Sequence, residues 1–363
     1  MSASHIATLQ ELVRAARANL DQNVWDYLVG GAETETTLRR NRQAIDSLAL
    51  VPRILRDVSD VRTDRVLLGH RLRVPLFLPP IGSVQVFSPS GGAAVARAAE
   101  AFGTLQFLSS VCLPELEEVA EASSAPKVYQ LYLLGDAAWM EERIRRAVAA
   151  GYAAFCLTAD TQVYSRRERD MLKRYIPSSG RQAAAVGDFV WQARMTWDTV
   201  KRIKDGFEIP LVLKGVATAE DAGLALEHGV DVIYVSNHGG RQLDHGRGSI
   251  DVLPEVVAEV AGRAPVLVDG GFLRGTDVVK ALALGATAVG VGRLECFGLA
   301  AAGEEGLVRA LEILEHEIRI ALALMGAPNL AALAPQSVAS LRPVAEPHVT
   351  SAFPHLELER WRY

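Results

Sequence analysis

The chain has 363 residues, of which 49% are hydrophobic, and its 38 basic and 43 acidic side chains give a formal net charge of −5. A chain of this length and composition can bury a large core. The charges are spread along the sequence, without a basic stretch that would suit nucleic acid or an anionic membrane surface. We therefore expect no nucleic-acid partner and no membrane partner, and a protein that acts on small molecules.

Targeting and redox features are limited to a few observations. The N-terminal segment lacks the apolar core of a secretion signal, and no apolar run reaches the roughly 18 residues of a membrane span, which predicts a cytoplasmic location. The three cysteines, Cys112, Cys156 and Cys296, lie far apart in apolar surroundings and lack metal-ligand spacing. We predict that they are buried reduced thiols and that the protein has no metal site.

Short runs of β-branched and apolar residues recur along the chain, and alanine-rich amphipathic stretches follow them. This alternation predicts strand–helix units around a parallel sheet. The predicted strands are Val74–Pro79, Thr104–Ser109, Lys127–Leu131, Ala153–Thr158, Pro210–Lys214, Asp231–Ser236, Pro265–Asp269 and Ala288–Val291. A doubly wound open sheet shows the same alternation, but eight units favour a closed barrel. We therefore predict one α/β domain over residues 1–363, a (β/α)8 TIM barrel.

Three segments lie outside this repeating pattern. Residues 1–70 precede the first predicted strand and are expected to form an N-terminal helical cap, because Ile6 to Leu20 is amphipathic. Residues 166–197 form the longest irregular segment, and a loop of this length after a barrel strand predicts an active-site lid. Residues 335–363 form a proline-rich C-terminal tail that suits either an interaction arm or a packed extension.

Polar residues follow several predicted strands, at the barrel end where catalytic groups gather in this architecture. His238 precedes Arg241 by three residues, which places a candidate base and a candidate carboxylate anchor on one loop. Asp160 is expected to orient the His238 imidazole and to favour its charged form. An isolated histidine is more often structural, but the neighbouring Arg241 favours the catalytic interpretation.

Two further cations occupy informative positions. Arg167 can hold a carboxylate together with Arg241, although the run Arg166–Arg169 also suits a solvated charged surface. Lys214 ends the apolar run Leu211–Leu213 and is therefore expected to be buried. A buried cation beside an electron-accepting ring would stabilise the reduced anion of that ring.

Glycines at the ends of the last two predicted strands indicate a phosphate site. Gly270, Gly271 and Gly292 leave backbone amides open at the barrel rim, and Arg293 supplies a cation beside them. The glycines alone are equally compatible with tight turns. Their joint position on the two strands favours phosphate binding.

The run Ser236–Asp244, with the sequence SNHGGRQLD, closely resembles the FMN-dependent 2-hydroxy acid oxidising family, which includes glycolate oxidase, lactate oxidase, mandelate dehydrogenase and hydroxymandelate oxidase. The resemblance covers roughly residues 10 to 330. It extends through Tyr27 with Gly31–Glu33, Gln130–Tyr132, Leu157–Thr161, Arg166–Glu168, Leu213–Val216, Asp269–Gly271 and Gly292–Arg293.

The resemblance implies a role for each matching residue. His238 would be the base, steadied by Asp160, as electrons pass from the substrate to the flavin. Arg241 and Arg167 would clamp the substrate carboxylate, and Tyr27 and Tyr132 would hydrogen-bond the carboxylate and hydroxyl. Lys214 would lie beside flavin N1 and O2. The residues implied to hold FMN are Pro80, Ile81, Gly82, Ser109, Gln130, Thr158, Lys214, Ser236, Asp269, Gly270, Gly271, Arg274, Gly292 and Arg293. The family also implies a homotetramer.

The sequence departs from the family pattern at several positions. Val111 stands where glycolate oxidase has tryptophan, which predicts a larger pocket for a bulky or aromatic substrate, and Tyr164 refills part of it. Gly82 lies where the family backbone approaches flavin N5, so oxidase, monooxygenase and dehydrogenase outcomes are all compatible with the sequence. Leu273 replaces an arginine that commonly contacts the phosphate, and Arg274 is expected to compensate.

The sequence thus predicts FMN-dependent oxidation of an L-2-hydroxy acid, such as mandelate, to the 2-keto acid, with oxygen or another electron acceptor reoxidising the flavin. An alternative is an FMN enzyme of the same fold with another substrate class: a 2-hydroxy acid monooxygenase, or a biosynthetic flavoenzyme acting on an amine or peptide. The carboxylate clamp disfavours a type 2 isopentenyl diphosphate isomerase. A non-catalytic barrel is disfavoured because no expected histidine or arginine is lost.

Overall fold

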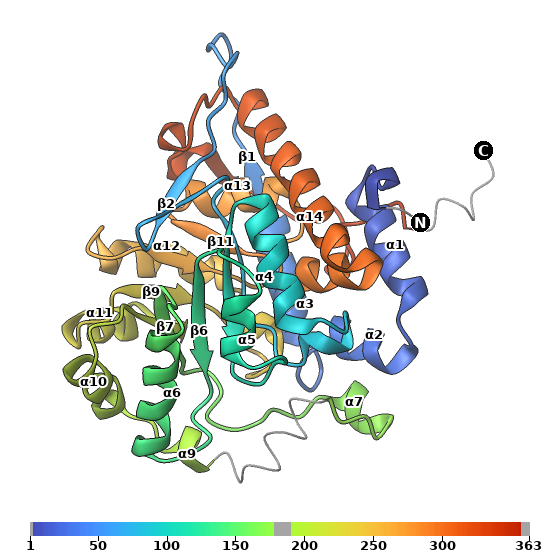
Figure 1. The fold of residues 1–363 in the computed structure, drawn as a ribbon. Helices are drawn as coiled ribbons and strands as arrows, with labels where there is room; N and C mark the ends of the chain where they lie inside the picture. Colours follow the sequence, from blue (N-terminus) through green and yellow to red (C-terminus); the bar gives the residue numbers. More distant parts are fainter. Residues whose placement is uncertain (1–2, 178–189, 357–363) are drawn as a thin grey trace.

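The computed structural model describes residues 3–177 and 190–356 and contains a closed barrel of parallel strands (Figure 1). The strand order around the barrel is β10-β11-β4-β5-β6-β7-β8-β9, so every strand is hydrogen-bonded on both sides. The strands are β4 (Leu76–Leu78), β5 (Leu105–Ser109), β6 (Lys127–Leu131), β7 (Ala154–Thr158), β8 (Leu211–Val216), β9 (Val232–Val235), β10 (Val266–Val268) and β11 (Ala288–Gly290). The predicted (β/α)8 barrel and all eight predicted strands are confirmed, with differences only at strand ends.

The barrel closes because its strands are apolar on both faces. In β9, Val232 and Tyr234 belong to the cluster inside the barrel, whereas the alternate residue Ile233 packs with the surrounding helices. The Tyr234 ring meets Phe77 edge-on, with centroids 5.3 Å apart. Leu67 joins the same inner cluster from the hairpin of β2 (Arg65–Leu67) and β3 (His70–Leu72), which therefore packs against the barrel interior.

Helices follow the barrel strands and cover the outside of the barrel (Figure 1). They are α4 (Gly91–Phe102), α5 (Leu116–Glu121), α6 (Ala137–Ala149), α10 (Trp197–Gly206), α11 (Ala219–Glu227), α12 (Ser249–Val260), α13 (Gly275–Ala283) and α14 (Gly292–Leu324). Thr218 caps α11 by accepting a hydrogen bond from the amide of Asp221, at 3.0 Å. Helix α14 is interrupted at Ala302–Gly303, where the backbone leaves the helical region.

The segment before the barrel contains α1 (Leu9–Asn19), α2 (Gln22–Val29) and α3 (Thr36–Asp46), followed by β1 (Leu48–Leu50) and the hairpin of β2 and β3. The capping box of Thr8 and Glu11 fixes the start of α1. Helix α1 lies along α14 (Figure 1), and α3 packs against the short helix η3 (His238–Gly240). The N-terminal segment is therefore in contact with the loop that carries His238.

The C-terminal tail is a packed extension as far as residue 356. After the short helices η4 (Leu330–Ala332) and η5 (Pro335–Ser337), β12 (Val338–Ser340) pairs antiparallel with β1. Val349 and Phe353 then join the main hydrophobic core. The predicted lid is described only at its two ends, by α7 (Glu168–Leu172) and α9 (Val190–Ala193), and its residues 178–189 lie outside the described residues.

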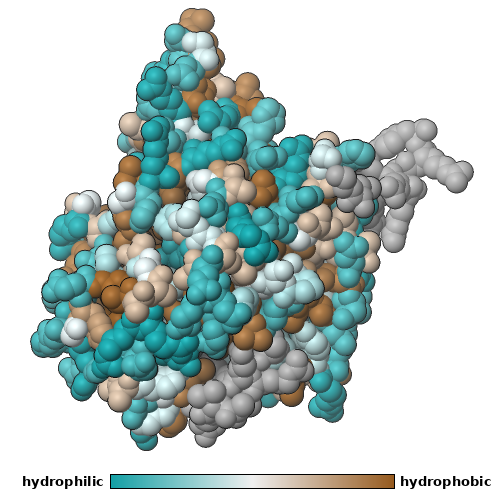
Figure 2. Space-filling view, viewed as in Figure 1, coloured by the Kyte–Doolittle hydropathy of each residue, from teal (hydrophilic) through white to brown (hydrophobic). Residues whose placement is uncertain are grey.

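The described residues show the state of the cysteines, the length and apolarity of the helices, and the grouping of potential metal ligands. All three cysteines are buried and free. Within residues 3–177 and 190–356, no helix combines the length and apolarity needed to cross a membrane, and no group of three potential metal ligands occurs. Figure 2 shows a mostly hydrophilic face with small, scattered apolar areas.

Candidate active site

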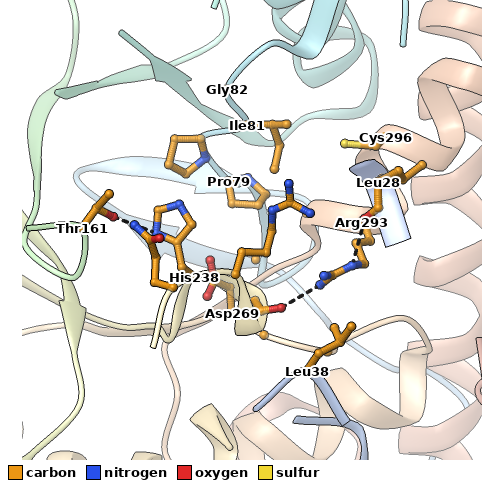
Figure 3. A pocket seen from close by; sticks show the side chains of 18 of the residues that line it. Leu28, Leu38, Pro79, Ile81, Gly82, Thr161, His238, Asp269, Arg293 and Cys296 are labelled. Atoms are coloured by element: carbon orange, nitrogen blue, oxygen red, sulfur yellow. Dashed lines mark hydrogen bonds between the residues drawn. The ribbon is translucent and has the colours of Figure 1, made fainter. Parts of the chain in front are cut away.

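A cavity opens at the carboxyl ends of the barrel strands, with a volume of about 1320 Å³ including its mouth. The cavity is lined both by residues predicted to bind substrate or act in catalysis and by residues predicted to bind the cofactor. Those predicted for substrate or catalysis are Tyr27, Val111, Tyr132, Tyr164, Arg167, Lys214, His238 and Arg241. Those predicted for the cofactor are Pro80, Ile81, Gly82, Asp269, Gly270, Gly271, Gly292 and Arg293. Figure 3 shows His238 beside Thr161 at one end of the cavity and Arg293 beside Leu28 at the other.

His238 lies on η3, which follows β9, and its imidazole contacts three residues, of which Thr161 lies with its Oγ1 3.3 Å from Nδ1. Nδ1 lies 3.0 Å from Oδ1 of Asp160, and Nε2 lies 3.1 Å from the Tyr132 hydroxyl. Because a carboxylate can only accept, Nδ1 carries the proton and Nε2 is left with its lone pair. The backbone of His238 has φ 58°, a conformation that is uncommon for a residue other than glycine. The imidazole is therefore held with its basic nitrogen toward the cavity.

The charges around His238 favour a neutral imidazole beside an ionised carboxylate. Burial lowers the pKa of His238 below its ordinary value, although Asp160 acts in the opposite direction. Burial alone would raise the pKa of Asp160, but Lys214 and His238 outweigh it and lower this pKa to about 2. Asp160 thus favours the charged imidazole, as predicted, but burial outweighs that contribution in the ligand-free protein.

Lys214 is buried near the end of β8, where a bulge interrupts the pairing with β9. Its Nζ donates to Ser236 Oγ at 3.0 Å and lies 3.9 Å from Oδ2 of Asp160. Ser236 in turn donates to Asp269, with 2.6 Å between the oxygens. Gly215, at φ 106°, allows this approach, since a Cβ there would lie 2.6 Å from that of Asp160. The bulge thus places a buried cation between two carboxylates.

Two arginines have buried N–H groups for which residues 3–177 and 190–356 supply no hydrogen-bond partner. Arg241 donates from Nη1 to the carbonyl oxygens of Tyr27 and Gly30, at 2.5 and 3.0 Å, and its Nη2 has no partner among the described residues. Arg167 donates from Nη1 to the Tyr164 hydroxyl at 2.9 Å, and its buried Nε has no partner within the described part of the chain. Their guanidinium carbons lie 4.6 Å from the Tyr27 ring centroid and 4.5 Å from the Tyr164 ring centroid. Burial, followed by Arg167, lowers the pKa of Arg241, so this site favours an added anion.

Arg293 lies at the first turn of α14, at the other end of the cavity. Its guanidinium donates to the carbonyl oxygens of Leu28, Gly239 and Gly30, at 3.2, 3.1 and 2.9 Å. Burial, and then the charge of Arg241, lower the pKa of Arg293 to about 9. Gly270 and Gly271 adopt φ of 106° and 91° beside it. A helix N-terminus, a buried cation and open glycine backbone together suit a phosphate.

The structure does not support the expectation that Arg274 compensates for Leu273. Leu273 lines the cavity, whereas Arg274 is absent from its walls. The Arg274 guanidinium instead donates to Glu317 at 2.6 Å and to the carbonyl oxygen of Ala352 at 3.1 Å. This ion pair with α14 directs the side chain away from the cavity, so Arg274 has a structural role here.

Four residues predicted to contact the cofactor lie at or next to the ends of barrel strands. They are Ser109, Gln130, Thr158 and Ser236, and all are buried. Gln130 donates from Nε2 to Thr158 Oγ1 at 2.8 Å, whereas its buried Oε1 has no hydrogen-bond partner in the part of the chain that the structure describes. Among the described residues, this unpartnered acceptor and the unpartnered N–H groups of Arg241 and Arg167 fit a large polar ligand with both donors and acceptors. The residues present therefore fit FMN.

Sequence reasoning missed part of the apolar wall. Leu134 and Phe87 line the cavity with Val111, and Cys296, Leu38 and Val349 line it as well. Cys296 follows Arg293 by one helical turn, which was a usable signal. Val349 belongs to the tail, and no local pattern indicates that a segment so distant in sequence reaches the cavity.

Comparison with known proteins agrees with this geometry. The family model for FMN-dependent dehydrogenases matches residues 16–340. L-lactate oxidase of Nostoc sp. is 39% identical over 346 residues, covering 89% of this chain and 95% of the relative. Glycolate oxidase of Spinacia oleracea is 36% identical over 356 residues, covering 92% and 96%. A crystal structure of mandelate oxidase with (S)-2-phenylpropionate is 38% identical, with a TM-score of 0.84, covering 94% of this chain and 100% of that one. The chain therefore belongs to the FMN-dependent dehydrogenase family and is an FMN-dependent enzyme.

Proposed function

We propose that the protein oxidises an L-2-hydroxy acid with a bulky or aromatic side chain, such as mandelate, to the 2-keto acid, with His238 as the base. The observation that carries this proposal is the hydrogen bond between His238 and Asp160, which leaves Nε2 of His238 as the basic nitrogen. The same cavity is lined by Arg241 and Arg167, each of which has an N–H group without a hydrogen-bond partner among the described residues. Relatives named for lactate, glycolate and mandelate oxidation support the substrate class.

The residues that line the cavity have separate roles in substrate binding and in proton transfer. The unpartnered N–H groups of Arg241 and Arg167 bind the substrate carboxylate, and Tyr27 and Tyr132 orient the carboxylate and hydroxyl. His238 takes a proton at Nε2 while its Nδ1–H keeps donating a hydrogen bond to Asp160. The negative charge of Asp160 stabilises the imidazolium that forms. Bound FMN supplies the two-electron acceptor, and oxygen or another acceptor restores it.

The apolar wall supports a large substrate side chain. Val111 and Leu134 form a small buried cluster with Tyr132, and Phe87 stacks with Tyr27 at 6.2 Å between ring centroids. These side chains offer hydrocarbon and aromatic surface but no charge to the substrate. A compact valine at position 111 leaves room that a tryptophan would fill.

The direct test is anaerobic addition of L-mandelate to the purified holoenzyme, with the flavin absorbance followed over time. Bleaching supports the proposal, and readmission of oxygen then separates an oxidase from an enzyme that needs another acceptor. A flavin that bleaches with L-lactate or glycolate but not with L-mandelate would contradict the aromatic preference and leave the 2-hydroxy acid chemistry standing.

Replacing Val111 with tryptophan should reverse the preference between large and small substrates. We expect kcat/KM for mandelate to fall on the order of 10–200-fold, because the indole takes up the space that the phenyl ring needs. The value for glycolate should change much less. Val111→Leu is the matched control, since it adds only one methylene. Equal losses for both substrates would contradict this assignment of the pocket.

The pH dependence follows from the lowered pKa of His238. Catalysis needs the neutral imidazole, so kcat/KM should fall below the ordinary histidine pKa of about 6.5 and should stay constant above it until Arg241, whose pKa is also lowered, loses its charge in the alkaline range. Asp160, with its pKa lowered to about 2, stays ionised throughout this range. An acid limb centred above pH 6.5 would contradict a neutral His238 in the free enzyme.

We also propose that the protein is a homotetramer in the cytoplasm. The segment between β1 and β2 projects from the body at the top of Figure 1, and its tip is apolar in Figure 2. Ile54 and Leu55 in this segment are 82% and 99% exposed, which suits burial against another copy of the chain. The molar mass in solution tests the tetramer, and cell fractionation tests the location.

A further inference from the structure

We infer that residues 341–356, here called the C-terminal strap, close the phosphate end of the cavity and slow the release of FMN. The inference rests on FMN binding and not on the choice of substrate. The strap begins where β12 ends, and β12 is held by three register pairs with β1. The following residues Leu341 and Val344 are strongly exposed, whereas Val349 and Phe353 are only 4% and 2% exposed.

Several contacts anchor the strap on the body of the protein. The Phe353 ring meets Phe297 of α14 edge-on, with centroids 6.3 Å apart. The Arg274 guanidinium donates to the carbonyl oxygen of Ala352 at 3.1 Å while Glu317 holds its other side. Near the end of the strap, Arg14 of α1 donates to the carbonyl oxygen of Leu356 at 3.3 Å. The strap is thus tied to α1, α13 and α14 rather than lying loosely over them.

Between these anchors, the strap contributes one side chain to the cavity. Val349 lines it together with Leu38 of α3 and Leu273, which precedes α13. Burial and then the charge of Arg169 lower the pKa of the neighbouring His348, and Glu35 and Arg39 also act on it, so this part of the strap lies near the start of α3. In Figure 3, Leu38 lies on the side of Arg293, away from Thr161. Val349 therefore belongs to the end of the cavity that suits a phosphate.

An apolar wall at this end has a physical effect on a bound anion. Such a wall would keep water from Arg293, which lines the same cavity, and charge-assisted hydrogen bonds are stronger where the surroundings are less polar. It also closes a route by which the phosphate would leave. The strap thus offsets the absence of a cation at Leu273 by enclosure instead of by charge.

The test compares strap variants of the full-length holoenzyme. Val349→Ala opens the wall, Phe353→Ala removes an anchor outside the cavity, and Val344→Asp changes an exposed residue of the same strap as the matched control. A further variant ends at Leu341. The holoenzymes are diluted, and FMN release is followed by flavin fluorescence, while circular dichroism of each protein with excess FMN checks the fold.

We expect the release rate to rise about tenfold in Val349→Ala and in Phe353→Ala, with more in the truncated chain, and no change in Val344→Asp. With saturating FMN, the first two variants should keep the circular dichroism spectrum of the parent. Release at the parental rate from folded Val349→Ala and Phe353→Ala would overturn the inference. An equal increase in Val344→Asp would overturn it as well. Neither outcome bears on the substrate, which the anaerobic assay tests separately.

Discussion

Replacing His238 with alanine is expected to slow reduction of the bound flavin by substrate about 10²–10⁴-fold. The variant keeps the carboxylate clamp but loses the atom that takes the proton, since Nε2 is the basic nitrogen of the pair with Asp160. Stopped-flow absorbance under anaerobic conditions measures the rate directly.

Two controls give this result its meaning. The oxidised flavin spectrum must be retained in His238→Ala, because loss of FMN would also abolish reduction. Asp160→Asn keeps a group of the same size beside Nδ1 but removes the negative charge that stabilises the imidazolium, so it should slow reduction without preventing FMN binding. Reduction at the parental rate in His238→Ala would remove this residue from the mechanism.

Replacing Arg241 with methionine should mainly weaken substrate binding. Truncating one partner of a buried charge pair costs about 2–5 kcal/mol, so we expect kcat/KM to fall roughly 30-fold to several-thousandfold. The loss should appear in KM and in the dissociation constant of the 2-keto acid product, because Arg241 holds the carboxylate in both.

The same variant should affect the ligand-free protein much less. Methionine removes a buried charge that Arg167 repels, but it also removes the hydrogen bonds from Nη1 to the carbonyl oxygens of Tyr27 and Gly30. Because these two effects oppose each other, the unfolding midpoint without ligand should stay near that of the parent, while the added stability that benzoylformate, the 2-keto acid of mandelate, gives the parent should disappear. A large loss of ligand-free stability would show that Arg241 serves the fold rather than the substrate. Arg167→Met supplies the matched comparison on the other half of the clamp.

The barrel was predictable from the sequence because its strands are short, continuous apolar runs with helical periodicity between them. Runs such as Leu211–Leu213 are buried on both faces, and no other element of a soluble protein shows this pattern so often. The pairing of β1 with β12 was not predictable, since each strand has only three residues and its partner lies almost 300 residues away. Contacts of this kind leave no periodic signal.

Some residues of the site could likewise be predicted from the sequence, and others could not. Residues at strand ends, such as His238 and Lys214, were found because the architecture fixes where strand ends meet. Arg274 was assigned wrongly to the phosphate, because its position next to Leu273 in the sequence does not determine which carboxylate forms an ion pair with its long side chain. In the structure Glu317, on another helix, captures it. The net direction of the His238 pKa also depended on burial, which only coordinates provide.

Tyr234 connects the packed interior of the barrel with the floor of the site. Its ring is wedged against Phe77 and Phe107, its hydroxyl donates to Asp269 at 2.7 Å, and the Lys214 ammonium lies 5.4 Å from its ring centroid. Repacking the Tyr234 layer would therefore move a carboxylate and a cation of the site, whereas Leu67 and Leu72 enter the inner cluster from the hairpin of β2 and β3. Efforts to engineer a more thermostable enzyme should change the hairpin end of the barrel and leave the Tyr234 layer intact.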